Sequence, residues 1–187
     1  MAHFALGKNY VADCFAHWHI ISDATPLLKD ADVIITHEFG DQHNVSLTTL
    51  NIVARGADLA HRFNKPMICQ FPGQQVAELA GIKPIYVIER HLLKPGEYLD
   101  TEEVNRQAAN VCKMNGWKRA IVVAHPHHEW RAAANLERHG ISTFYPKTSD
   151  IPYDPSLRKS RPILSTPALF VPREILARLL YLKKGWI

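Results

Sequence analysis

Residues 119–131 read Arg-Ala-Ile-Val-Val-Ala-His-Pro-His-His-Glu-Trp-Arg, an apolar run that ends in a cluster of ionisable side chains. The run Ala120–Ala124 is short, rich in valine and isoleucine and free of polar alternation, which is typical of a strand buried on both faces. His125, His128 and Arg131 follow at a spacing of three, so a helix that begins at this turn would carry them on one face. The segment therefore predicts a buried strand followed by a helix with a polar N-terminal turn.

The same alternation of apolar runs and amphipathic stretches extends along most of the chain. Together with the strand at residues 119–124, strands are predicted at residues 32–36, 66–70, 84–89 and 141–144. Helices are predicted at residues 46–64, 101–115 and 127–138 and after Pro172, with Ser46 and Thr101 as N-caps for the first two. The expected fold is α/β, a three-layer Rossmann-like, doubly wound arrangement around a mainly parallel sheet of about five strands.

We expect a single domain over residues 1–187, with residues 1–30 as an N-terminal extension. Residues 145–171 contain repeated prolines and no helical period, which predicts a long loop that wraps the surface. Residues 172–187 predict a closing helix with its leucines on one face and basic residues elsewhere. Either these leucines pack on the sheet, or the helix makes peripheral contact with an anionic membrane surface.

Composition narrows the class of protein. Apolar residues make up 47% of the chain and charged residues 21%, as in an ordinary globular protein. The three cysteines lie far apart with no CxxC pair. Residues 1–9 lack the basic block followed by an apolar block that a signal peptide has. No stretch approaches the ~18 apolar residues of a membrane span. We therefore expect a cytoplasmic protein.

The formal net charge is +4, and basic residues outnumber acidic ones in the C-terminal part of the chain. This asymmetry favours either an anionic partner or a solvated basic face. Aromatic RNA-binding motifs and heptad repeats are absent from the sequence, so no nucleic acid is expected among the partners.

Polar residues crowd the loops that follow four predicted strands. In a doubly wound sheet, ligands bind beyond the carboxyl ends of the strands. We expect the catalytic candidates to be His128, Glu103 and His125, and the ligand-binding candidates to be Arg131, Thr101, His37, Asp41 and Gln70.

Each of these residue types suits a particular role. Arg131 would pair with an anionic group, and a histidine such as His128 would donate or transfer a proton. Glu103 and Thr101 would orient the side chains of Arg131 and His128. The alternative is that His128 caps the helix, or that Arg131 pairs with a neighbouring acid.

A metal is not expected, although His37, Asp41, His43 and Glu103 lie in loops near the histidine turn. The spacing His-x-His-His is not that of a zinc motif, and the HExxH pattern is absent from the sequence. The chain also lacks GxGxxG, Walker A and GxSxG patterns, so neither a dinucleotide fingerprint nor a covalent nucleophile is indicated.

Several short motifs taken together resemble the YdcF-like family, which includes SanA and ElyC. They are Thr101-Glu-Glu, the run from Lys118 to Ala132, and Gly140-Ile141, and the closing Arg173-Glu-Ile-Leu-Ala-Arg resembles that family's last helix. In the family pattern, Thr101, Glu103, His128, Arg131 and Ala132 occupy the matching positions. The likeness covers residues 84–141 and the tail, whereas the loops after the first two strands depart from the family's glycine-rich pattern.

The resemblance implies a Rossmann-like fold and, for some members, S-adenosylmethionine binding or a role in envelope biogenesis. We therefore expect a small-molecule-binding protein, with enzymatic activity left open, that holds a nucleotide-like or phosphorylated ligand at the strand ends. S-adenosylmethionine is one candidate ligand. The alternatives are a non-catalytic adaptor that docks an acidic partner or a membrane through its basic tail, and a metal-dependent hydrolase.

Overall fold

The computed structural model describes residues 28–38, 45–71, 73–89, 100–160 and 162–187. Asp41, which the sequence predicts at the rim of the site, lies outside the described residues, as do His43 and most of the predicted N-terminal extension.

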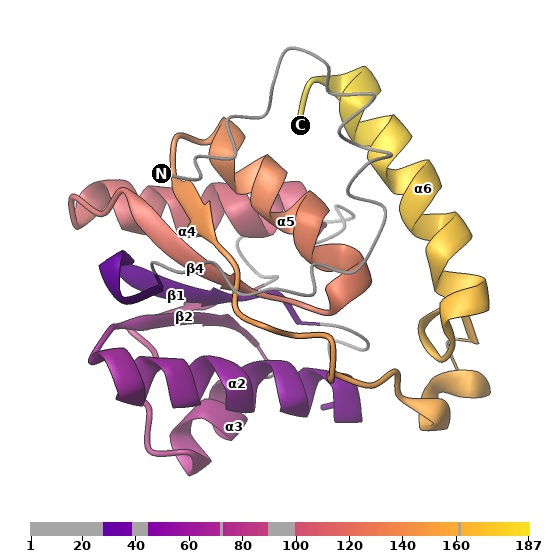
Figure 1. The fold of residues 1–187 in the computed structure, drawn as a ribbon, viewed down its shortest axis with the longest axis horizontal. Helices are drawn as coiled ribbons and strands as arrows, with labels where there is room; N and C mark the ends of the chain where they lie inside the picture. Colours follow the sequence, from indigo (N-terminus) through magenta and orange to yellow (C-terminus); the bar gives the residue numbers. More distant parts are fainter. Residues whose placement is uncertain (1–27, 39–44, 72, 90–99, 161) are drawn as a thin grey trace.

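Five parallel strands form one sheet (Figure 1). They are β1 (Val33–Thr36), β2 (Met67–Gln70), β3 (Tyr86–Ile88), β4 (Arg119–Val123) and β5 (Ser142–Phe144), in the order β3-β2-β1-β4-β5. This sheet confirms the predicted α/β, Rossmann-like fold, and each strand end lies within two residues of its predicted position. The chain order reverses between β1 and β4, so the carboxyl ends of these two strands flank the topological switch point.

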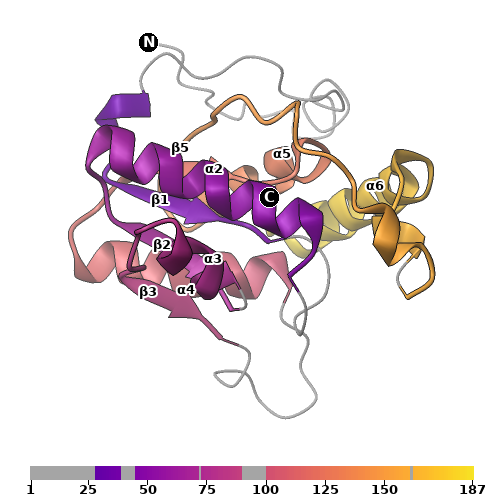
Figure 2. The same ribbon diagram turned by 90° about the horizontal axis from the view of Figure 1, so that it is seen from below.

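Helices cover both faces of the sheet, which makes three layers (Figures 1 and 2). One layer holds α2 (Leu47–Phe63) and α3 (Gly73–Leu79), and the other holds α4 (Thr101–Met114) and α5 (Pro126–Arg138). Among these, only α3 was not predicted. A short 3-10 helix, η1 (Leu28–Asp30), precedes β1.

Each face of the sheet has its own apolar core because successive strand side chains point to opposite sides. On the α4–α5 side, Val33 and Ile35 pack with helix residues such as Ala108 and Leu136. On the α2–α3 side, the alternate residues of the strands pack with the helices and with parts of the 145–170 segment. Gly56 lets α2 lie directly on the sheet, because a Cβ there would come within 2.6 Å of Thr36 Cγ2.

Two helix starts show how side chains replace missing backbone partners. The Ser46 hydroxyl accepts a hydrogen bond from the Thr49 amide at 3.1 Å, as predicted for the N-cap of α2. The predicted N-cap of α4 was wrong by one residue, since Asp100 accepts from the Glu103 amide at 3.0 Å. The hydroxyl of Thr101 is thereby left available for another contact.

The closing helix begins earlier than predicted. Helix α6 spans Pro167–Lys184, so Pro172 lies inside it and the wrapping segment is shorter than expected. That segment also contains two 3-10 helices, η3 (Pro155–Arg158) and η4 (Pro162–Leu164). Pro167 at the first helical position needs no hydrogen-bond partner for its nitrogen, and Phe170, buried in the core, fixes the first turn.

Helix α6 turns a mixed polar and aromatic face inward. Its buried residues are Phe170, Glu174, Arg178 and Tyr181. The leucines at 176, 179 and 180 are exposed, so the expectation that they pack on the sheet was wrong. The helix packs mainly on α5 and η4 (Figure 1), and Phe170 in its first turn joins the core on the α2–α3 side of the sheet. Among the described residues, no helix has the length and apolar character needed to cross a bilayer.

Candidate functional site

Histidines from two neighbouring strands meet at the switch point. His37 follows β1, and its backbone amide donates to the Val123 carbonyl at 2.8 Å. His125 follows β4 and is the N-cap of α5, with His128 one turn further on. The rings of His37 and His128 lie edge to face, with 5.9 Å between centroids. We call His37, His125 and His128 the switch-point histidines.

The wrapping segment adds an aromatic wall. The Tyr153 ring lies 4.2 Å from the His125 ring between centroids, and its hydroxyl is 3.0 Å from His127 Nδ1. Phe170 of α6 packs on both rings of the His125–Tyr153 pair. Segments from β4, the wrapping loop and α6 therefore enclose His125, which is 1% exposed.

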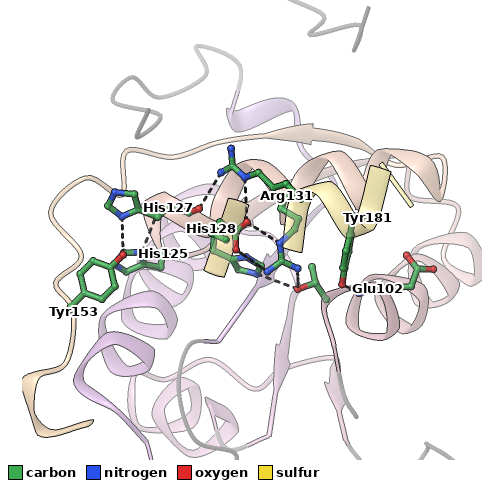
Figure 3. Close-up of polar contacts among 10 residues, drawn as sticks. Glu102, His125, His127, His128, Arg131, Tyr153 and Tyr181 are labelled. Carbon is green, nitrogen blue, oxygen red and sulfur yellow. Dashed lines mark hydrogen bonds and ion pairs between the residues drawn. The ribbon is translucent and has the colours of Figure 1, made fainter. Parts of the chain in front are cut away.

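Arg131 is held by a carboxylate of the protein itself (Figure 3). Its Nε and one terminal nitrogen donate to the two oxygens of Glu174 at 2.8 and 2.9 Å, a bidentate pair in which both side chains are buried. Tyr181 lies beneath the guanidinium, 4.8 Å from its central carbon. The structure therefore shows the alternative that the sequence left open, in which Arg131 pairs with an acid of the protein, and pairing of Arg131 with a ligand anion stays a prediction.

Arg178 is a second arginine on the same carboxylate. Its Nε lies 3.4 Å from Glu174 Oε1, and its guanidinium donates to the His127 carbonyl at 3.2 Å and lies over the Trp130 ring. Two guanidinium groups thus share one carboxylate, so this arginine–glutamate cluster carries one net positive charge.

The nearest contact of His128 assigns its tautomer. A terminal nitrogen of Arg131 is 3.1 Å from His128 Nδ1, closer than Glu174 Oε2 at 3.7 Å, and because a guanidinium can only donate, this nearer contact assigns Nδ1 as the acceptor. The proton of the neutral ring then sits on Nε2, 3.5 Å from the Thr101 hydroxyl. Thr101 in turn accepts from Arg131 at 2.8 Å. The predicted grouping of Thr101, His128 and Arg131 is therefore present.

Burial holds the switch-point histidines neutral. Desolvation is the largest cause in each case, and it lowers the pKa of His37 and His125 to about 3 and that of His128 to about 4. The Arg131 guanidinium lowers the pKa of His128 further, whereas the Glu174 carboxylate opposes the lowering in both His128 and His125. At neutral pH the cluster therefore offers uncharged imidazoles.

We expect the ring nitrogens of His37 and His128 to keep their neutral chemical shifts from neutral pH down to about pH 5. The measurement is a ring nitrogen–proton correlation NMR spectrum recorded as a function of pH, with a histidine-containing peptide as the reference. A His128 ring that titrates together with the peptide would contradict the buried, arginine-facing environment described above.

Glu38 is an acid at the switch point that sequence reasoning passed over. One of its oxygens accepts from the Gln70 amide at 3.0 Å and the other from the Gly73 amide at 3.2 Å. Gly73 is needed for this approach, because a Cβ there would lie 2.1 Å from Glu38 Oε1. Burial raises the pKa of Glu38 to about 8, against the opposing effect of these two amides.

Glu103 does not take the role predicted for it. Its carboxylate binds Arg106 at 2.5 and 2.7 Å and Gln107 at 2.9 Å, all within α4, so it does not orient Arg131 or His128. Gln70 ends β2 as predicted and is half-buried there.

Asn105 links the site to the C-terminal residues. Its amide nitrogen donates to Asn135 Oδ1 and to the Ala132 carbonyl, both at 2.7 Å. Asn135 in turn donates to the Trp186 carbonyl at 2.7 Å and to Glu102. Asn105 also lies beside His37, where it favours the protonated ring, although the two make no hydrogen bond of ordinary geometry.

Comparison with known proteins gives no family for this chain: no family model, no curated protein and no solved structure matches it. The resemblance to the YdcF-like family stays a prediction. Within the described ranges, no group of three or more histidine, cysteine, aspartate or glutamate side chains is arranged to hold a metal ion.

Sequence reasoning missed Glu38, Asn105, Tyr153 and Glu174. A signal existed for Glu174, because Phe170, Glu174, Arg178 and Tyr181 recur at spacings of four, four and three opposite the leucines. That pattern marks a second helix face, which reasoning from the leucines alone ignored. Tyr153 and Asn105 carried no comparable local signal.

Proposed function

We propose that this protein binds a small anionic or nucleotide-like molecule at the carboxyl ends of β1 and β4. The observation that carries the proposal is the convergence at the switch point of His37 and Glu38 from one strand with His125 and His128 from the other. Ligands of doubly wound sheets bind in this position, and groups with strongly shifted pKa values concentrate at functional sites.

The electrostatics favour an anionic ligand without a direct arginine contact. The arginine–glutamate cluster has one net positive charge, and the switch-point histidines add no negative charge. The N-terminus of α5 also lies at this edge, where its dipole is positive. Arg131 would therefore act on a ligand through its field while it stays paired with Glu174.

Direct contact would come from the side chains that are only partly buried. These are Glu38, Gln70, Thr101 and His127, whereas the switch-point histidines lie beneath the surface. Because its pKa is about 8, the Glu38 carboxyl is largely protonated at neutral pH and can donate to an anion. A carboxyl in this pKa range also suits proton transfer, which leaves an enzymatic role open.

Calorimetric titration with S-adenosylmethionine and a panel of nucleotides tests the proposal. We expect saturable binding of at least one compound, weakened about tenfold by Gln70→Ala through the loss of a polar contact. Asn115→Ala, an exposed amide at the end of α4, is the matched control and should leave the affinity unchanged. Absence of binding by every compound, or equal loss in both variants, would refute the proposed site.

The pH dependence gives a sharper test of Glu38. Its carboxyl becomes negative as the pH rises through about 8, so affinity for an anionic ligand should fall there. Glu38→Gln keeps a neutral side chain at every pH and should bind with the same affinity on both sides of that value. A fall in affinity that persists in Glu38→Gln would exclude Glu38 as its source.

A further inference from the structure

Helix α6 exposes an apolar stripe to solvent. Leu169, Leu176, Leu179 and Leu180 are 48%, 68%, 44% and 48% exposed. Leu176 follows Leu169 by seven residues, and Leu179 and Leu180 follow Leu176 by three and four, so all four lie on one side of the helix. In Figures 1 and 2 the helix lies at the periphery of the molecule, with one side away from the rest of the chain. The stripe is therefore turned outward along much of α6.

The arrangement is the reverse of an ordinary surface helix. A helix on a soluble core normally buries its leucines and exposes its charges. In α6, Glu174 and Arg178 are 2% exposed and form the arginine–glutamate cluster, and that cluster fixes which side faces out. The leucines cannot turn inward without breaking the buried ion pair with Arg131.

The charged residues that α6 itself leaves on its surface all have one sign. Glu174 is the only acid in α6, and because it is buried, the charged groups left on the helix surface are the exposed Lys183 and Lys184 and the half-buried Arg173. At the other end, η4 contacts both α6 and η3, and η3 ends with the exposed Arg158, followed by the exposed Lys159. Positive charge therefore flanks both ends of the leucines.

We propose that the leucine face of α6 docks onto an anionic membrane surface. Exposed leucines with flanking lysines fit the interface of a bilayer that contains acidic lipids, with the leucines among the acyl chains and the lysines at the headgroups. The Lys184 ammonium lies 4.0 Å from the centre of the Trp186 ring, but Trp186 itself packs on the buried Tyr181, so the leucines and the lysines carry the docking. A second copy of the chain fits less well, because its own cationic flanks would meet those of the first.

Co-sedimentation of the full chain with vesicles tests this docking. We expect binding to phosphatidylcholine vesicles that contain phosphatidylglycerol, and little binding to phosphatidylcholine alone. Leu176→Ser with Leu180→Ser should abolish the binding, and Lys183→Gln with Lys184→Gln should weaken it by about tenfold or more. Leu79→Ser on α3 is the matched control, since Leu79 is 90% exposed and lies away from α6.

The results of these experiments distinguish a membrane from a second copy of the chain as the partner of the leucine face. Failure of the wild type to bind the acidic vesicles, or undiminished binding by the leucine variant, would overturn the proposal. A dimer in light scattering that the leucine variant converts to a monomer, without vesicle binding, would assign the face to a second copy instead. Should the leucine variant unfold, the lysine variant and the loss of binding at high salt still decide the question.

Discussion

Glu174→Gln is expected to lower the free energy of unfolding by about 3–5 kcal/mol, since it leaves buried cations without a counter-charge. The substitution keeps the shape of the side chain but removes the charge that both Arg131 and Arg178 face. It also leaves His128 beside a positive charge that nothing balances, which further opposes protonation of its ring. Because the pair joins α5 to α6, the loss should first loosen the closing helix.

Urea and thermal unfolding followed by circular dichroism measure this effect, and a fall in Tm of roughly 10 °C corresponds to it. Asp150→Asn is the matched control: it removes an exposed ion pair with Arg55, in which Asp150 is 60% exposed, and should cost about 0–1 kcal/mol. If the two variants lose equally little stability, the buried pair does not hold α6 in place.

A second buried carboxyl, Glu129, has the opposite effect on stability. It lies on α5 with no exposed surface, and its Oε2 accepts a hydrogen bond from the Thr148 hydroxyl at 3.0 Å. Its other oxygen is buried without a hydrogen-bond partner among the described residues. Burial raises the pKa of Glu129 well above its usual value. The native state therefore holds this carboxyl in its neutral form.

Glu129→Gln is expected to stabilise the protein at neutral pH, because the folded wild type holds a proton there that its unfolded chain releases. In the unfolded chain the Glu129 carboxyl ionises above about pH 4.5, whereas in the native protein it keeps its proton. The contribution of Glu129 to the stability of the wild type is therefore fully present below that pH and is lost as the pH rises. The loss is about 1.4 kcal/mol for each pH unit over which the native group stays protonated. A glutamine does not ionise, so the difference in free energy of unfolding between Glu129→Gln and the wild type should fall to zero as the pH falls to about 4.5.

Denaturant unfolding of both proteins across this pH range measures the difference. Glu78→Gln on the exposed side of α3 controls for the substitution itself and should change stability little at any pH. A glutamine variant at 129 that is less stable than the wild type at neutral pH would mean that the carboxylate is charged and paired in the native state.

The fold could be predicted from local sequence patterns because each strand and helix is a contiguous segment with its own apolar pattern. A run such as Ala120–Ala124 is apolar at every position, since both of its faces are covered. Short strands of this kind, separated by amphipathic helices, permit few topologies other than a parallel doubly wound sheet. The short helix Gly73–Leu79 was missed because it is too brief to show a period.

The site was only partly readable because pairing between distant segments decides it. The spacing of His128 and Arg131 predicted that they share a helix face, and they do. Nothing near Arg131 in the sequence indicates that Glu174, 43 residues away, reaches it. Glu103 looked equally suitable in sequence, yet its own helix supplies Arg106 and Gln107 as nearer partners.

Local sequence therefore specified the strands, most of the helices and the edge of the sheet at which polar residues gather. The partners of the charged groups followed only from the packed chain, where Arg131 and Arg178 meet Glu174 and the leucines of α6 are left outside. The physical reason is that apolar periodicity reports burial one element at a time, whereas a buried charge is stable only where another element brings its opposite.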